Sequence, residues 1–569
     1  MLVLEARRLT GPNLLLDSAG AAVEVTFEPA ELAAAAGARR VDPLLRARAR
    51  LERISHALQW PLQLVVRHHG NGATLAIAAD TDRLNTAVDL LEWAVQPRGL
   101  GSLPRATAKL KLRLAAEVNP DLLRLQAWAG DHGIRLLWDE QVVSLGSGAG
   151  CLSWPARDLP EPHQLNPDRF GQIPTALITG TNGKTTTSRL LARMARCAGM
   201  RVGNTTTDGW SIDEQLVESG DWTGPGAARK VLRDARVECA VLETARGGLL
   251  RRGLAVTDAD VAVVTNASDD HLGEWGIDSV DAMAEAKLTV AKGLFPGGTL
   301  VVNRDCAPLM AAVTRLGLDR SGLALARFCI DPTAELQAEL FSHGDAFAFS
   351  KRGALWWQRG GLQVQVLPLS EVPICFGGHA VHNVENALAA LLAGHALGLP
   401  WEAIRQGLRS FHPSATDNPG RANHLVLGGA TVLLDFAHNP DGVRRMVQLA
   451  RALPAKRRLI TLGQGGDRSD AAIRTLADTA FELAADRYVL KESLHYLRGR
   501  EIGEVTDLLR QQLLERGVSP QQIAVCQDEA AAVEDALAWL RPGDLLILLI
   551  HDDFAAALAR LTAAGALPA

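Results

Sequence analysis

Cysteine is scarce in this chain, whose 569 residues include seven cysteines with no metal-type spacing between them. Such scattered thiols offer no metal cluster and are typical of reduced cysteines in the cytoplasm. Long apolar runs are also missing, since the longest purely aliphatic run, LLILLI at 545–550, is far too short to cross a bilayer. A net charge of −5 gives no support to a nucleic-acid or membrane surface. The N-terminus MLVLEARRLTGPN lacks the anatomy of a signal peptide, so we expect a cytoplasmic protein.

One stretch, ALITGTNGKTTTSRLLARMARCAG at 176–199, joins a strand-like run to an amphipathic run through glycine, lysine and threonine residues. Such a turn at the start of a helix directs backbone N–H groups and the helix dipole at an anion, which favours phosphate binding. Lys184 would reach the β- and γ-phosphates, and the Thr185 hydroxyl would face Mg²⁺. The general nucleotide loop has a glycine where this chain has Ile178, and an ordinary strand-to-helix turn is the alternative. The predicted phosphate-binding residues are Gly180, Thr181, Asn182, Gly183, Lys184, Thr185 and Thr186.

Three regions follow one another along the chain. Short alternating runs mix with helical stretches over 1–163, which predicts an α+β domain that ends in the proline-rich linker CLSWPARDLPEPHQLNP. Strand-like runs recur with helices between them over 164–414 and again over 415–569, a pattern typical of parallel sheets with crossover helices. The predicted fold class is therefore α/β in three domains: an N-terminal α+β module, a central parallel-sheet domain with the phosphate loop, and a Rossmann-like C-terminal domain.

Metal-binding side chains follow two later strands. The run AVLET ends in Glu243, and VAVVTN ends in Asn266 and is followed by Asp270 and His271. Ligands of such sheets bind at the carboxyl ends of the strands. We therefore expect Glu243 and His271 to hold one or two Mg²⁺ ions together with Thr185 and nucleotide oxygens. A helix-capping role for Glu243 and an ordinary loop position for His271 are the alternatives.

Eight motifs stand in the order found in the Mur ligase superfamily, which the chain resembles from about residue 170 to its end. They are TGTNGKTTT, LETARGG, NASDDHLG, AKLTVAKG, VNRD, HNVENALAA, PGR and DFAHNP. The segments TTTDG, GDWTGPGAA and ETARGGLLRRGL are similar to the Mur-like half of the cyanophycin synthetases, and ARRLTGPNLL resembles the start of their N-terminal domain. The resemblance implies an ATP- and Mg²⁺-dependent ligase that activates a carboxylate as an acyl phosphate and joins it to an amine.

The resemblance also implies roles for single residues. The implied catalytic residues are Lys184, His271, Lys287 and Arg421. The implied nucleotide contacts beyond the loop are Asn303, Asp305, Asn383, Asn386, Arg421, Asp435 and His438. Lys287 matches a lysine that many Mur ligases carry as a carbamate, and a solvated helix lysine is the alternative. The asparagines of the central helix could instead cap or pack, and Arg421 could be a surface charge.

The resemblance places the amine donor on the third domain. Residues in the matching motifs there are Asp467, Arg468, Lys491, Glu492 and Glu504. In cyanophycin synthetases this half adds arginine to an aspartate side chain, and a guanidinium needs a carboxylate partner, which Glu492 or Asp467 could supply. Ordinary surface acids are the alternative.

The chain departs from the cyanophycin synthetases at one place. Those enzymes carry an ATP-grasp module before their Mur-like half, whereas about twenty residues separate the N-terminal region from the phosphate loop here. We therefore expect one ATP-dependent site, an amino-acid donor, and an acceptor that is an aspartate-bearing peptide or its building block. A homo-oligomer is expected, with a separate ATP-grasp ligase as a candidate partner. The alternative is a catalytically silent accessory protein that binds polymer, although the loop lysine and the metal acids are all present.

Overall fold

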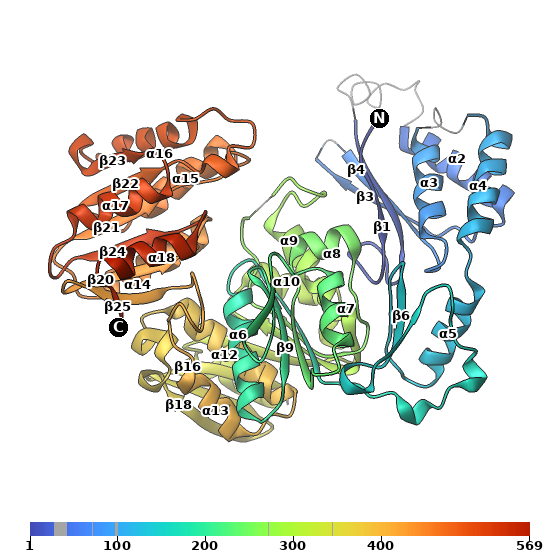
Figure 1. Cartoon of the computed structure of the whole chain (residues 1–569), viewed down its shortest axis with the longest axis horizontal. Helices are drawn as coiled ribbons and strands as arrows, with labels where there is room; N and C mark the ends of the chain where they lie inside the picture. Colours follow the sequence, from blue (N-terminus) through green and yellow to red (C-terminus); the bar gives the residue numbers. More distant parts are fainter. Residues whose placement is uncertain (28–42, 71, 97–100, 271, 344) are drawn as a thin grey trace. The chain divides into compact units, whose positions relative to one another are not determined.

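The computed structural model describes residues 1–27, 43–70, 72–96, 101–270, 272–343 and 345–569 (Figure 1). The chain divides into two compact units. The first contains Met1–Ala267, Leu272–Arg327 and Ala389–Ile404, and the second contains Ser268–His271, Phe328–Leu388 and Arg405–Ala569. The three domain boundaries expected from the sequence stay predictions. Among the described residues, no helix combines the length and the apolar character needed to cross a membrane.

The first unit begins with a four-stranded antiparallel sheet in the order β1-β2-β4-β3. Its strands are β1 (Leu2–Leu9), β2 (Gly20–Thr26), β3 (Leu64–His69) and β4 (Gly72–Ala78), and the helices that follow or separate them are α2 (Pro43–Leu58), α3 (Leu84–Val95) and α4 (Leu103–Glu117). Alternate strand residues such as Val23 and Ile77 pack with Leu51 and Leu90 of the helices in one buried core. This α+β module agrees with the predicted character of the region.

A small subdomain connects this module to the next sheet. It contains α5 (Pro120–Asp131) and the antiparallel strands β5 (Leu136–Trp138), β6 (Val142–Leu145) and β7 (Leu152–Pro155). Arg135, whose side chain is buried, donates to Asp258 at 2.8 Å and to Thr175 Oγ1 at 2.9 Å. The subdomain is therefore fixed to the first strand of the central sheet.

The central sheet of the first unit has the strand order β11-β10-β9-β12-β8-β13-β14, and β9, β12, β8, β13 and β14 run parallel. The strands are β8 (Thr175–Thr179), β9 (Val202–Thr206), β10 (Gly209–Ile212), β11 (Gln215–Ser219), β12 (Cys239–Glu243), β13 (Ala259–Val264) and β14 (Leu294–Asn303). The helices are α6 (Lys184–Cys197), α7 (Pro225–Arg233), α8 (Arg246–Arg252), α9 (Val280–Leu288) and α10 (Ala307–Arg315). Every residue of β8 is buried, as expected for a parallel strand covered on both faces.

Several elements lie at or beyond the boundary between the two units. The strand β15 (Ala324–Ile330) and the helices α12 (Val381–Ala396) and α13 (Trp401–Ser410) contain residues of both. The second unit also holds α11 (Ala334–His343) and the antiparallel strands β16 (Ala346–Lys351), β17 (Ala354–Arg359) and β18 (Leu362–Pro368).

The C-terminal sheet of the second unit has the order β23-β22-β21-β24-β20-β19-β25, with a parallel core from β23 to β20. Its strands are β19 (Asn423–Leu427), β20 (Ala430–Asp435), β21 (Arg458–Leu462), β22 (Arg487–Lys491), β23 (Ile523–Cys526), β24 (Leu545–Leu549) and β25 (Leu567–Pro568). Its helices are α14 (Pro440–Ala452), α15 (Asp470–Phe481), α16 (Glu504–Glu515), α17 (Glu529–Trp539) and α18 (Phe554–Ala563).

Helices cover both faces of this sheet. In β24, Leu545, Ile547 and Leu549 pack with residues of α14, α15 and α16. The alternate residues Leu546 and Leu548 pack with α17 and α18. A strand with both faces buried reads as a continuous apolar run, which explains LLILLI. The predicted α/β class, with a central parallel sheet and a Rossmann-like C-terminal sheet, is confirmed.

Candidate active site

A tight turn joins β8 to α6 in the first unit. A Cβ atom at Gly180, whose φ is 155°, would lie 1.8 Å from Thr265 Oγ1, so the position requires glycine. Gly183 has a left-handed φ of 84° and precedes α6, whose first backbone bond runs from Thr187 N to Gly183 O at 2.9 Å. The N–H groups in the first turn of a helix lie outside the intrahelical ladder, at the positive end of the helix dipole. The turn therefore has the geometry of an anion site.

The end of the neighbouring strand β13 holds this turn in place. Asn266 accepts the backbone N–H of Thr181 through its carbonyl at 3.1 Å, and that of Asn182 through its Oδ1 at 2.9 Å. Thr265 Oγ1 donates to the Asn182 carbonyl at 2.6 Å. Asn266 ends the run VAVVTN, and its polar side chain directly after a buried strand is the only feature of the sequence that points to this role. These contacts engage the N–H groups of Thr181 and Asn182 and hold the turn against the end of β13.

A hydroxyl and a carboxylate meet where the turn becomes a helix. Thr185 Oγ1 donates to Glu243 Oε2 at 2.9 Å, and both residues are buried. The parallel pairing of β12 with β8, which sets Glu243 opposite Ile178, produces this contact. Oxygen ligands of this kind suit Mg²⁺, which usually binds one or two carboxylates and completes its shell with waters and phosphate oxygens. His271 lies outside the described residues. The described residues contain no cluster of three or more His, Cys, Asp and Glu that could hold a metal by itself.

Replacing Glu243 with glutamine should raise the Mg²⁺ concentration that half-saturates ATP hydrolysis by about tenfold or more. The amide keeps the size of the side chain and an oxygen for Thr185, but it removes the negative charge. ATPase rates measured against Mg²⁺ concentration check this expectation. Glu238→Gln, at an exposed position just before β12, is the matched control. Superimposable Mg²⁺ curves for Glu243→Gln and the wild type would show that Glu243 does not contact the metal.

The other predicted residues of the first unit lie near strand and helix ends. Lys184 is half-buried, and its Nζ donates to the Thr181 carbonyl at 3.0 Å. Lys287 lies in the last turn of α9 and is only 3% exposed, which contradicts the alternative of a solvated helix lysine. Asn303 ends β14 in a buried position, and its Oδ1 accepts the backbone N–H of Asp305 at 2.9 Å.

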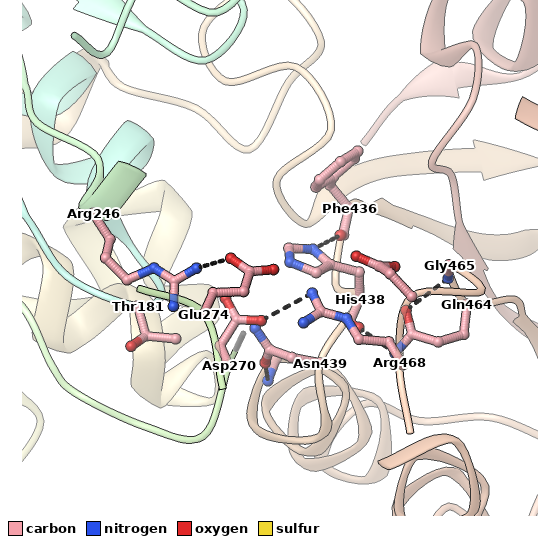
Figure 2. A network of polar contacts seen from close by, with 12 residues as sticks. Thr181, Arg246, Asp270, Glu274, Phe436, His438, Asn439, Gln464, Gly465 and Arg468 are labelled. Carbon is pink, nitrogen blue, oxygen red and sulfur yellow. Dashed lines mark hydrogen bonds and ion pairs between the residues drawn. The ribbon is translucent and has the colours of Figure 1, made fainter. Parts of the chain in front are cut away.

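The predicted residues of the second unit gather at the carboxyl end of β20. Asp435 accepts the backbone N–H groups of Ala422 and Ala437, both at 2.7 Å. Burial raises the pKa of the Asp435 carboxyl, and the Arg421 guanidinium opposes this shift. Arg421 also lies over the ring of Phe436, 5.0 Å from its centroid. His438 Nδ1 lies 3.1 Å from the Phe436 carbonyl, as Figure 2 shows.

Two further groups of predicted residues engage partners within the second unit. Asn383 Nδ2 donates to the Ile374 carbonyl at 2.9 Å, and Asn386 Nδ2 donates to Asn383 Oδ1 at 3.1 Å. Asn439, in the motif DFAHNP, lies just before α14 and accepts the Gly442 N–H through its Oδ1 at 2.8 Å. These bonds give the asparagines packing and capping contacts.

The residues expected to receive the amine donor also have partners. Lys491 is buried and pairs with Glu529. The buried Glu492 accepts from the Thr506 hydroxyl and from Gly503 N at 3.1 Å. Two more pairs join Asp467 to Arg498 and Glu504 to Arg500.

Figure 2 shows two ion pairs of the loops that follow β12 and β13. Arg246 pairs with Glu274 in the first unit, and Arg468 pairs with Asp270 at 3.2 Å in the second. The loop residues 180–186, Glu243, Lys287, Asn303 and Asp305 thus belong to one unit. Arg421, Asp435 and His438 belong to the other.

Two family models match the chain. Residues 178–394 match the Mur ligase middle domain, and residues 420–549 match the Mur ligase, glutamate ligase domain. The chain therefore belongs to the Mur ligase family over these two regions, which confirms the resemblance predicted from the motifs.

Particular relatives refine this assignment. The chain is 37% identical to a cyanophycin synthetase of Trichormus variabilis over 382 residues, which are 67% of this chain and 42% of that protein. It is 39% identical to a cyanophycin synthetase of a Synechocystis species over 377 residues, which are 66% of this chain and 42% of that protein. It is 28% identical over 458 residues to a UDP-N-acetylmuramoyl-L-alanyl-D-glutamate–2,6-diaminopimelate ligase of Xanthomonas campestris. The alignment covers 74% of this chain and 83% of that protein. The chain spans less than half the length of the cyanophycin synthetases it matches.

Proposed function

We propose that the chain is an ATP-dependent amide ligase of the Mur type. The observation that carries the proposal is the buried contact between Thr185 and Glu243 beside a glycine turn at the start of α6. In the proposed reaction, the γ-phosphoryl group of ATP moves to a carboxylate oxygen of the acceptor. The amine nitrogen of an amino acid then attacks the acyl carbon, the carbon–oxygen bond to phosphate breaks, and the nitrogen loses a proton. The products are the amide, ADP and inorganic phosphate.

The residues of the turn have separate roles in this proposal. Lys184 and the N–H groups of the first turn of α6 neutralise and position the transferred phosphoryl group. Thr185 and Glu243 hold Mg²⁺, which supplies further charge neutralisation when bound. The roles of His271, Lys287, Asn303, Asp305 and the second-unit residues follow the family pattern and remain part of the proposal.

The proposed acceptor is an aspartate-containing peptide or its building block, and the proposed donor is an amino acid. The segments TTTDG and GDWTGPGAA, together with relatives named as cyanophycin synthetases, support this choice over another small acid. We also place the protein in the cytoplasm, where ATP and reduced thiols are found. The test is phosphate release with ATP and Mg²⁺ over a panel of amino acids and aspartate-containing acceptors. Release that no amino acid and acceptor pair stimulates would contradict the proposal.

This chain alone should not extend an aspartate backbone. A branched polymer with a second amino acid on each side chain needs two kinds of amide bond, and the described residues contain one phosphate loop with one metal carboxylate. Only the short segment between β7 and β8 separates the N-terminal modules from the central sheet, too little for a second ligase domain. Incubation with ATP, Mg²⁺, aspartate, arginine and a short primer, followed by mass spectrometry, should show single additions of one amino acid. A ladder spaced by whole Asp–Arg units would contradict this expectation.

A further inference from the structure

Two pairs of adjacent arginines, far apart in the sequence, meet at one pocket of the first unit. Arg7 and Arg8 lie near the end of β1, in the motif ARRLTGPNLL. Arg251 and Arg252 end α8, in the motif ETARGGLLRRGL. Both pairs line a pocket of about 200 Å³, which Arg113 of α4 also lines. The proposed ligase mechanism uses none of these residues.

Backbone contacts fix the position of the two pairs relative to each other. The carbonyl of Arg252 accepts the N–H of Thr10 at 2.6 Å, and the Leu254 N–H donates to the Pro12 carbonyl at 2.8 Å. Arg7 Nε donates to the Leu250 carbonyl at 3.1 Å. Figure 1 shows β1 passing beside α8. These contacts hold the end of β1 against the end of α8 at the pocket.

The pocket carries more positive than negative charge. Five arginines line it, but only two acids, Glu5 and Asp89, do so. Asp89 pairs with Arg113 at 2.8 Å, and Glu5 lies 3.6 Å from Arg251. The Arg252 guanidinium forms no hydrogen bond or ion pair with any residue that the structure describes.

The charges of Arg7 and Arg8 are partly compensated by acids that do not line the pocket. Arg7, whose side chain is 6% exposed, lies 3.5 Å from Glu24, and Arg8 pairs with Glu140. Burial lowers the pKa of Arg7, and Glu5 and Glu24 oppose this shift. Because Arg113 and Arg251 lie against Asp89 and Glu5, the excess positive charge of the pocket rests on Arg252.

We propose that this pocket binds a small multivalent anion with closely spaced carboxylate or phosphate groups. Planar guanidinium groups bind both kinds of anion with two parallel hydrogen bonds. The volume corresponds to roughly seven water molecules at ~30 Å³ each, which limits the size of the bound group. The site is separate from the phosphate loop, because Gly180, Lys184 and Glu243 are absent from its lining.

Calorimetric titration tests this site with two probes, inorganic phosphate and a tetra-aspartate peptide. The full chain carries Lys184→Ala in every sample, so that binding at the phosphate loop is weakened. Arg113→Gln and Arg252→Gln are each expected to weaken binding about tenfold, because each removes a charge-assisted hydrogen bond. Added salt should weaken binding as well. Arg157→Gln, an exposed arginine outside the pocket, is the matched control, and circular dichroism checks that each variant folds.

The outcomes separate the two sources of the anion. Tighter binding of phosphate identifies a free oxyanion, and tighter binding of the peptide identifies an acidic peptide chain; either supports the site if the pocket variants reduce it. Binding of neither probe, or equal binding by Arg113→Gln, Arg252→Gln and Arg157→Gln, overturns the proposal. Ligation assays on the chain with Lys184 intact keep this result apart from the proposed function. Normal ligation without anion binding would overturn the anion site and leave the proposed ligase function standing. Anion binding without ligation would contradict the ligase function and leave the anion site standing.

Discussion

Replacing Lys184 with alanine is expected to lower the rate of ATP-dependent amide formation by about a hundredfold or more. The ammonium group lies at the start of α6, 3.0 Å from the Thr181 carbonyl, in the turn that Asn266 braces. A preorganised charge at this position stabilises the transition state of phosphoryl transfer more than the ground state, so its loss lowers the rate of the chemical step. The fold should persist, because Lys184 is half-buried and no buried ion pair depends on it.

Phosphate release with a stimulating amino acid and acceptor measures this effect. Lys109→Ala, at an exposed position on α4, is the matched control, and circular dichroism shows whether each variant is folded. A Lys184→Ala variant within about twofold of the wild-type rate would contradict the assignment of the turn to ATP.

The sequence was sufficient to predict the turn between β8 and α6. Residues near one another in the chain make this feature, and the alternation of a buried strand, two glycines and an amphipathic helix is visible in the letters alone. The parallel order of neighbouring strands also made it possible to expect Glu243 beside Thr185, because both lie at carboxyl ends. The motif order predicted the family, which the matches to the Mur ligase domains confirm.

Contacts between distant segments could not be predicted in the same way. Asn266 is a polar residue directly after a buried strand, but nothing local to it or to Thr265 indicates contact with a turn that lies more than eighty residues earlier in the chain. The two arginine pairs look like ordinary surface charges until β1 and α8 lie together. Lys491 and Glu492 are neighbours in one motif, yet their buried side chains have different partners. Lys491 pairs with Glu529, and Glu492 accepts from the Thr506 hydroxyl. Pairing of this kind depends on sheet order and side-chain direction, which composition and spacing do not specify.

Replacing Glu529 with glutamine is expected to destabilise the C-terminal sheet by about 3–5 kcal/mol. Glu529 is 5% exposed and pairs with the fully buried Lys491. It also accepts the backbone N–H groups of His551 at 2.6 Å and Asp553 at 3.0 Å. Glutamine keeps the volume and an acceptor oxygen but removes the carboxylate that contacts the ammonium of Lys491, and a poorly compensated buried charge is far more costly than a buried amide.

Hydrogen–deuterium exchange of peptides from β21, β22 and β24 measures this loss, because it reports the opening of the sheet separately from the rest of the chain. The double variant Glu529→Gln/Lys491→Met should recover much of the protection, since it removes both charges of the buried pair. Asp478→Asn, which breaks the exposed pair with Arg516, should have a much smaller effect.

Burial alone would raise the pKa of the Glu529 carboxyl, but Lys491 and the backbone donors hold it below its ordinary value. A carboxyl with a depressed pKa stabilises the fold above its unfolded pKa, and this contribution is lost as the pH falls through the folded value. The difference between the wild type and Glu529→Gln should therefore narrow below about pH 4. Equal protection in Glu529→Gln and Asp478→Asn at neutral pH would show that the buried pair does not stabilise the sheet.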